Sequence, residues 1–426
     1  MRFKLSKFIL PSVVSMILVG TYTNVDGLFI GNVCGDNGIA AINIAWPIVA
    51  LITSIGTGIG VGGSVMLNTL RGKGDTDGAA RVKTTLLLLL AVAGIVSTLV
   101  LLLLYKPLLV LMGAQGQVLD YAENYSKIVC IGAFFQIAGS GLIALLRNEE
   151  KTYFSMLCCL VGLAVHVLLD ILLVQKHTLG GVAVSTVLSQ AVIMVMCLFA
   201  LGKKNFGRAD KKYAWEILKA STSPLGINFV PSLVLFFTNL FALKIGAEAA
   251  VSAYGVMSYA VYTFEYFYQG VVDGVQPVLS YCQGTGDDEN KKRALKTSLI
   301  VLGGSTAVFM LLTPLMIWGM PKIFSVSAQA ADLMKTGFIV YAFAYPFKAV
   351  VKFICAYYYA VGETKISNLL IYADPIFFTP ITLLVLSGLG MTGVWLSLTI
   401  SQLCIAALGV LSLVKKNKKQ IKEPTE

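Results

Sequence analysis

Five carboxylates stand inside long apolar runs of this 426-residue chain, and they are the residues best placed to do chemistry. A charge at the centre of a bilayer costs at least about 2.5–3.5 kcal/mol, so such groups usually face a protein interior or a water-filled cavity. Burial also disfavours the charged form of a carboxylate, which suits a group that must gain and lose a proton. The five candidates are Asp26, Asp170, Glu265, Asp273 and Asp374.

Two of these acids have polar neighbours at helical spacing. Tyr22 precedes Asp26 by four residues, and His166 precedes Asp170 by four, so each pair shares one face of a helix. Thr186 follows on the next apolar run and could supply a hydroxyl. We expect these five residues to form one ion site for a proton or a sodium ion, with a structural, hydrogen-bonded role as the alternative for His166.

A second group of polar residues recurs at steps of three and four along residues 249–280, hence on one helical face. Acids surrounded by aromatic rings suit lipophilic cations, through charge and cation–π attraction. Packing or an interface belt is the alternative for the rings, and a structural role at a helix break is the alternative for Asp374, which precedes Pro375. The candidate ligand-binding residues are Tyr262, Glu265, Tyr266, Gln269, Asp273 and Tyr345, with Lys348 and Lys352 nearby, of which Lys348 could neutralise Glu265 or Asp273.

The elements that must position these side chains are membrane spans. The composition is 57% hydrophobic and 13% charged, with a mean hydropathy of +0.79, which excludes a typical water-soluble enzyme. We therefore expect an all-α integral membrane protein with twelve transmembrane helices. The predicted spans are residues 8–31, 39–68, 84–104, 121–146, 154–175, 180–201, 219–244, 249–280, 297–318, 333–360, 366–386 and 391–413.

The basic residues are distributed unevenly between the two sides of these spans. Of 33 Lys and Arg, 25 fall at the ends of the chain and in loops on one side, and five fall on the other. This bias predicts that both termini are cytoplasmic. It also explains the net charge of +11 by membrane topology, so we expect no nucleic-acid partner.

The chain repeats itself at an offset of about 212 residues. Residues 71–75 are echoed by 283–287, and residues 181–185 by 393–397. Two parallel halves of six spans follow, and duplicated transporters commonly place substrate between such halves. The predicted domains are an N-terminal bundle at 1–202, a cytoplasmic linker at 203–218, a C-terminal bundle at 219–414 and a basic tail at 415–426.

Motifs for nucleotide binding or hydrolysis have little support. Gly58, Gly60 and Gly63 spell G-x-G-x-x-G, but they lie inside an apolar span, where small residues four apart indicate close helix packing. The sequence contains no Walker motif, H-E-x-x-H or G-x-S-x-G. We therefore expect that the protein is not an enzyme and that it uses no cofactor. We also expect it to bind no metal apart from a transported sodium ion at Asp26 and Asp170.

Several segments together resemble the multidrug and toxic compound extrusion (MATE) family of transporters. Residues 25–31, VDGLFIG, are similar to the signature of that family's first helix. The resemblance covers nearly the whole chain, including the number of spans and the duplication. The other matching segments are AWPI at 45–48, RGKGD at 71–75, LLD at 168–170, GGVA at 180–183 and GVQPVLSY at 274–281.

The resemblance implies two six-helix bundles arranged as a V, with a central cavity and export of organic cations in exchange for protons or sodium. It also implies that Asp26 and Asp170 couple the ion, with Thr186 as a helper. An Asn is common in the family where this chain has His166, which favours a proton over sodium. We expect a monomeric efflux antiporter of the bacterial plasma membrane whose partners are small organic cations, H⁺ or Na⁺, and the lipid bilayer.

Two alternatives remain open from the sequence. One is a lipid-linked oligosaccharide flippase of the same superfamily, which would need a strongly basic cavity, whereas the acids within spans outnumber the lysines five to three. The other is an intramembrane enzyme, which would need a nucleophile or metal set that the sequence does not display.

Overall fold

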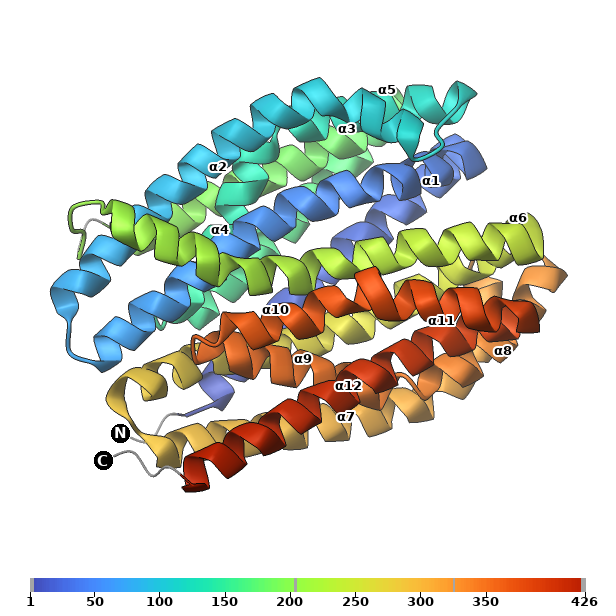
Figure 1. The fold of residues 1–426 in the computed structure, drawn as a ribbon. Helices are drawn as coiled ribbons and strands as arrows, with labels where there is room; N and C mark the ends of the chain where they lie inside the picture. The colour runs from blue at the N-terminus through green and yellow to red at the C-terminus, as the bar shows by residue number, and fades with distance from the viewer. Residues whose placement is uncertain (1–3, 203–204, 325, 423–426) are drawn as a thin grey trace.

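The computed structural model describes residues 4–202, 205–324 and 326–422, and within them the chain is almost entirely helical (Figure 1). Residues 203–204 of the predicted linker and 423–426 of the predicted tail lie outside the described residues. The helices are α1 (Ser6–Gly72), α2 (Thr76–Leu111), α3 (Gly116–Ile131), α4 (Ala133–Asn148), α5 (Thr152–Leu201), α6 (Lys211–Thr285), α7 (Asp288–Ile323), α8 (Ala328–Ala342), α9 (Tyr345–Ala360), α10 (Thr364–Ala373), η1 (Asp374–Phe378), α11 (Thr379–Leu386), η2 (Ser387–Leu389) and α12 (Met391–Lys422).

Membrane spans account for most of this helix. By length and composition, eight described helices could cross a membrane, or ten if the bent pairs α3–α4 and α8–α9 each count as one span. The remaining predicted spans lie inside longer helices. The backbone of α5 breaks at Thr178 and that of α1 at Gly35, each between two predicted spans, so α1 has a first arm at Ser6–Gly31 and a second at Asn37–Gly72. Helix α6 has a first arm at Lys211–Gly246, and its second arm, which follows, contains the predicted span that carries Glu265 and Asp273.

The helices form two groups that lie against each other (Figure 1). Helices α1–α5 gather on one side and α7–α12 on the other, with the long helix α6 running between them, and both ends of the chain lie at the same end of the molecule. One large buried core comes almost entirely from the first group. Another core joins the first arm of α1 to the second arm of α6, so apolar packing also holds the two groups together.

The predicted repeat is visible as the same turn in both halves. Gly74 and Gly286 adopt positive φ values of 80° and 71°, which glycine reaches without strain. The next residue, Asp75 or Asp287, then caps the following helix, accepting a hydrogen bond from the backbone N–H of the residue three positions on (2.8 and 3.0 Å). Because Asp287 accepts this bond, its pKa lies below the ordinary value of an aspartate.

The seam between the two groups depends on glycine. A Cβ atom on Gly274 of α6 would lie 2.6 Å from the Cα of Ile9 in α1, and one on Gly270 would lie 2.5 Å from the Cα of Val13. The glycines are four residues apart, as are their partners, so the two helix backbones pack directly on each other. The predicted packing role of Gly60 is also confirmed, since it lies against the backbone of Gly141 in α4.

The described part of the predicted linker 203–218, which begins at residue 205, is only partly extended. Helix α6 begins at Lys211, well before the apolar run. Ahead of it, Asp210 forms an ion pair with Arg81 of α2, and its backbone N–H donates to the hydroxyl of Thr85 (3.0 Å). The linker is therefore fixed to the start of α2.

Candidate functional site

The predicted ion site comes together between α1 and α5. The Nε2 atom of His166 lies 2.7 Å from Oδ1 of Asp26 and 3.2 Å from Oδ2 of Asp170. His166 and Asp170 are fully buried and Asp26 is 8% exposed. One imidazole therefore stands between two carboxylates inside the first bundle.

This cluster has unused hydrogen-bonding capacity. Within the described residues, Oδ1 of Asp170 and Nδ1 of His166 have no hydrogen-bond partner, and the partner of Oδ2 of Asp170 is Nε2 of His166 at 3.2 Å. Buried polar atoms are usually satisfied, so unsatisfied ones point to a role beyond packing. One ligand atom from each of the three residues lies within 4.8 Å of the others, so the group can hold a cation or exchange a proton.

The other two predicted members occupy different positions. Tyr22 packs edge-on against His166, with ring centroids 4.8 Å apart, and its hydroxyl donates to the carbonyl of Cys159 (3.4 Å). It therefore supports the imidazole rather than the carboxylates. The hydroxyl of Thr186 donates to the carbonyl of Val182 within its own helix (3.0 Å), so that proton is committed to the backbone.

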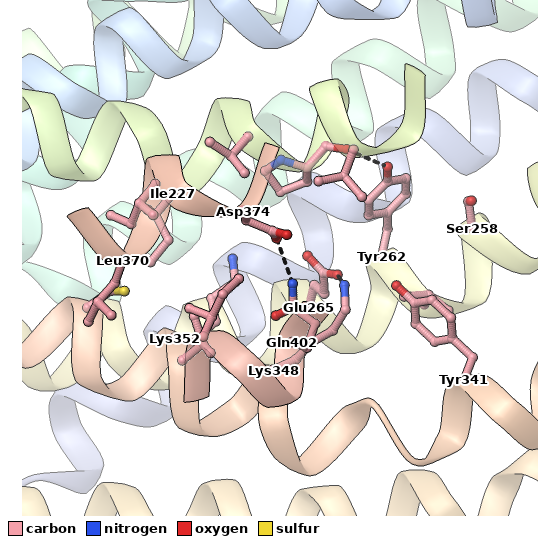
Figure 2. Close-up of a pocket in the computed structure, with 18 of the residues that line it drawn as sticks. Ile227, Ser258, Tyr262, Glu265, Tyr341, Lys348, Lys352, Leu370, Asp374 and Gln402 are labelled. Carbon is pink, nitrogen blue, oxygen red and sulfur yellow. Dashed lines mark hydrogen bonds and ion pairs between the residues drawn. The ribbon is translucent and has the colours of Figure 1, made fainter. Parts of the chain in front are cut away.

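A pocket lies within the second bundle (Figure 2). Its walls come from both arms of α6 and from α8–α10, η1 and α12. The charged residues in the walls are Glu265, Lys348, Lys352 and Asp374, and the aromatic ones are Tyr254, Tyr262 and Tyr341.

Two of the four pocket charges neutralise each other, because Lys348 donates to Glu265 in an ion pair. The other two contact neutral groups. Lys352 Nζ donates to Oε1 of Gln269 (3.0 Å), and the carboxylate of Asp374 accepts three hydrogen bonds from neutral side chains. These donors are Thr379 (2.7 Å), Ser401 (2.5 Å) and Gln402 (2.6 Å).

Of the six predicted ligand-binding residues, Tyr262 and Glu265 line the pocket. Gln269, Asp273, Tyr266 and Tyr345 lie on neighbouring faces. Tyr266 packs on α1, where a Cβ added to Gly20 would lie 2.5 Å from its ring. Tyr345 is buried against Phe264, with ring centroids 5.3 Å apart.

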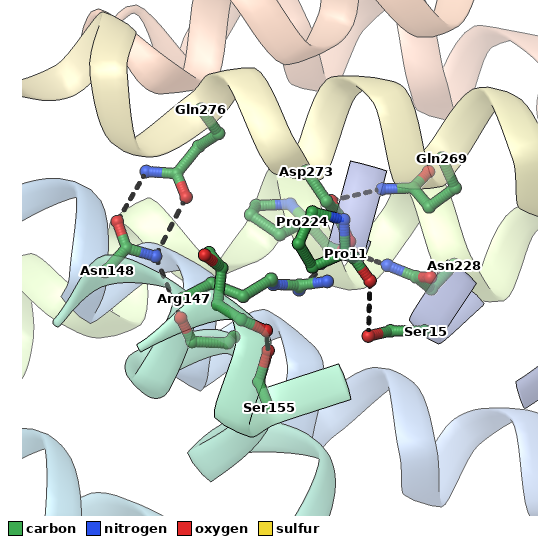
Figure 3. A network of polar contacts seen from close by, with 12 residues as sticks. Pro11, Ser15, Arg147, Asn148, Ser155, Pro224, Asn228, Gln269, Asp273 and Gln276 are labelled. Carbon is green, nitrogen blue, oxygen red and sulfur yellow. Dashed lines mark hydrogen bonds and ion pairs between the residues drawn. The ribbon is translucent and has the colours of Figure 1, made fainter. Parts of the chain in front are cut away.

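Asp273 faces the first bundle instead of the pocket (Figure 3). Its Oδ2 lies 3.0 Å from Nη2 of Arg147 in α4, and its Oδ1 accepts a hydrogen bond from Gln269 (2.7 Å). One position after Arg147 in α4 and three positions after Asp273 in α6, the amides of Asn148 and Gln276 exchange hydrogen bonds of 3.1 and 3.2 Å. These contacts join the two bundles through buried polar groups.

The sequence pattern placed Arg147 and Lys83 among the basic residues of the loops, and this was wrong, because both are buried in helices. Arg147 is 3% exposed and pairs with Asp273, and Lys83 is 2% exposed and lies 3.3 Å from Glu149. The reason is that α2 and α4 extend beyond their apolar runs, so charged residues near the helix ends are covered by neighbouring helices. Their burial could have been suspected only from the acids that pair with them.

Comparison with known proteins assigns the fold and the family. The family model described as MatE matches residues 11–172 and 225–373, one segment in each half. The chain belongs to the MatE family. This membership confirms the resemblance seen in the sequence and the prediction of a membrane transporter rather than an enzyme.

Named relatives match along nearly the whole chain. The multidrug export protein MepA of Staphylococcus haemolyticus is 23% identical over 423 residues, covering 95% of this chain and 91% of the relative. MepA of Staphylococcus aureus strain MRSA252 is 23% identical over 432 residues, covering 96% and 93%.

Solved structures agree with the predicted fold. A MATE transporter in complex with MaL6 and a MOP superfamily transporter from Pyrococcus furiosus, described as having a binding pocket of reverse polarity, each give a TM-score of 0.88 at 20% identity. Each match covers 98% of this chain and 96% of the other.

Proposed function

We propose that this protein is a secondary-active antiporter that exports small organic molecules, organic cations among them, from a bacterial cell in exchange for protons. The observation that carries the proposal is the buried cluster of Asp26, His166 and Asp170 in the first bundle, separate from the pocket in the second. Buried acids paired with His are typical of proton relays in pumps and transporters. The export activity of the MepA relatives supports the same function.

The donor set of the cluster favours a proton over sodium as the coupling ion. An imidazole nitrogen lies within 3.2 Å of both acidic side chains, in the space where a cation bridging the carboxylates would sit. A histidine can itself carry and release the proton. The two acids and the histidine would then change charge together as one unit.

The second arm of α6 gives a physical route between ion and ligand. Tyr262 and Glu265 on this arm line the pocket, while Tyr259 and Tyr266 face the α1 arm that carries Asp26. A charge change at Asp26 that shifts α1 would therefore move the wall of the pocket. Coupling requires only that ion and ligand differ in affinity for two arrangements of the bundles.

Orientation and assembly complete the proposal. The excess of basic residues on one side of the spans supports cytoplasmic termini in the plasma membrane. A monomer suffices, because one chain supplies both the ion cluster and the pocket, and no cofactor is needed when an ion gradient is the energy source.

The flippase alternative is less well supported by the pocket. Such a protein would need a strongly basic cavity for a pyrophosphate group, whereas this pocket carries two lysines and two acids. Arg147 is a buried base in addition to the three lysines predicted within spans. It does not make the pocket more basic, because it is paired with Asp273 and lies outside the pocket.

Transport in proteoliposomes, with pH and sodium gradients imposed separately, tests the proposal. We expect export of a fluorescent cation driven by the pH gradient alone. Asp26→Asn and Asp170→Asn should each abolish this export while the purified proteins still bind the cation, because Asn keeps the shape but cannot release a proton. Full pH-driven export by the double variant would refute the assignment.

A further inference from the structure

We propose that the pocket of the second bundle selects amphoteric ligands, which carry an acid group as well as a cationic group, with Lys352 receiving the acid and Asp374 the cation. This inference rests on the proposed function and specifies its ligand class. It concerns residues that the ion cluster does not use.

The pocket walls carry two acids and two lysines. Glu265 and Lys348 form an ion pair with each other, which leaves Lys352 and Asp374 as the two remaining charges. Neither has an ion pair in the part of the chain that the structure describes. Figure 2 shows both side chains extending into the same space from different helices, Lys352 from α9 and Asp374 from the start of η1.

Lys352 has no ion pair of its own in a confined place, because the nearby carboxylate of Glu265 is paired with Lys348. Its ammonium group has three N–H donors, and the recorded bond is to one neutral acceptor, Oε1 of Gln269 (3.0 Å). The amide nitrogen of Gln269 donates to Asp273, which fixes the amide so that its oxygen faces Lys352. A cation withdrawn from water without a partner is costly, so a carboxylate on the ligand would be favoured here.

Asp374 is held in place by uncharged side chains. Thr379, Ser401 and Gln402 donate hydrogen bonds to it, and all three are neutral, so they orient the carboxylate without cancelling its charge. The π-helical turn that begins at Asp374 places it on the pocket wall. Tyr254, Tyr262 and Tyr341 also line the pocket and offer ring faces to a cation.

These features favour an amphoteric ligand over a purely cationic one. A ligand with a single positive charge could use Asp374, but it would meet the positive charge of Lys352 in the same pocket. A ligand that carries both groups satisfies both residues.

Two dyes that differ at one group provide the test. Rhodamine B is a zwitterion with a free carboxylate, and its ethyl ester is a cation of nearly the same shape. Binding of each dye to the purified protein in detergent is measured by fluorescence anisotropy, without any ion gradient. The variants are Lys352→Met, Lys352→Arg and Asp374→Asn, with Lys335→Met, an exposed lysine outside the pocket, as the matched control.

We expect Lys352→Met to weaken rhodamine B by about tenfold or more, the usual effect of losing a hydrogen bond to a charged group, and to leave the ester within about twofold. Lys352→Arg should retain the preference, and Asp374→Asn should weaken both dyes. Equal effects of Lys352→Met on the two dyes, or no effect on either, would overturn the inference. If Lys352→Met does not elute as a monodisperse protein, Lys352→Gln carries the same test.

Failure of this inference and failure of the proposed function give different results. Asp26→Asn should keep the preference for rhodamine B over its ester, because Lys352 and Asp374 are unchanged in that variant. A protein that exports cations on a pH gradient but shows no Lys352-dependent preference contradicts the ligand class alone. A protein that binds the dyes as expected but does not transport them contradicts the antiport.

Discussion

Arg147 of α4 and Asp273 of α6 form a buried ion pair between the two bundles, with Nη2 and Oδ2 3.0 Å apart. Both side chains are at most 4% exposed. Beside them, Asn148 and Gln276 exchange hydrogen bonds, and Asn148 also accepts one from Asn68 (2.6 Å). Any motion that separates the bundles here must break a charged contact as well as apolar packing.

Removing one partner of this pair should destabilise the protein strongly. Arg147→Met leaves Asp273 buried without a counter-charge, and losing one partner of a buried pair costs about 3–5 kcal/mol. The double variant Arg147→Met, Asp273→Leu removes both charges and should recover much of that loss. Thermal unfolding of the detergent-solubilised proteins measures both effects, and a double variant no more stable than Arg147→Met would contradict the argument.

Gly274→Ala should loosen the seam between α1 and α6. The added methyl would lie 2.6 Å from the Cα of Ile9 and 2.7 Å from the carbonyl oxygen of Phe8, so backbone must move, at a typical cost of about 1–3 kcal/mol. Gly303→Ala on α7 is the matched control, because nothing lies within 4 Å of the added atom there. The melting temperature should fall for Gly274→Ala only, and equal changes in the two variants would count against close packing.

His166→Asn should change the pH dependence of transport. A positive imidazole 2.7 Å from Asp26 favours the charged carboxylate, and Asn provides no such charge. Without it the two acids hold their protons to higher pH, so the pH profile of export should move to higher pH. Initial rates in proteoliposomes from pH 5.5 to 8.5 measure the shift, and an unchanged profile would remove His166 from the coupling unit.

Cysteine labelling tests the orientation of the chain. Lys73 and Glu289 are exposed in loops or helix starts at the end predicted to be cytoplasmic, and Asp120 is exposed on the opposite side. In a background with the native cysteines replaced, an impermeant maleimide added to intact cells should label Asp120→Cys alone. Labelling of Lys73→Cys or Glu289→Cys from outside would reverse the proposed topology.

Much of the fold could be predicted because it follows from hydropathy. Apolar runs of about twenty residues give the spans, and the glycine and aspartate of residues 74–75 and 286–287 give the same turn twice. The ion cluster could be predicted for a similar reason. Acids inside apolar runs are few, and the four-residue spacing of His166 and Asp170 puts them on one face.

The sequence could not predict that the polar residues on one face of 249–280 lie in two different surroundings. Glu265 and Asp273 share a helical face in sequence, yet Glu265 lines the pocket and Asp273 faces Arg147. The difference depends on which helix covers each turn of α6, and periodicity carries no information on that. The burial of Arg147 depends in the same way on a partner distant in the sequence.

The placement of the ion cluster in one bundle and the charged pocket in the other has an evolutionary consequence. At the offsets of the internal repeat, Asp26 and Asp170 correspond to Asn239 and Thr382, while Lys348 and Asp374 correspond to Gln136 and Gly162. After duplication, each copy thus holds charges that the other lacks. Selection for new ligands can act on the second half of the gene while the first half keeps its energy coupling, so ligand range can diverge quickly in such a protein.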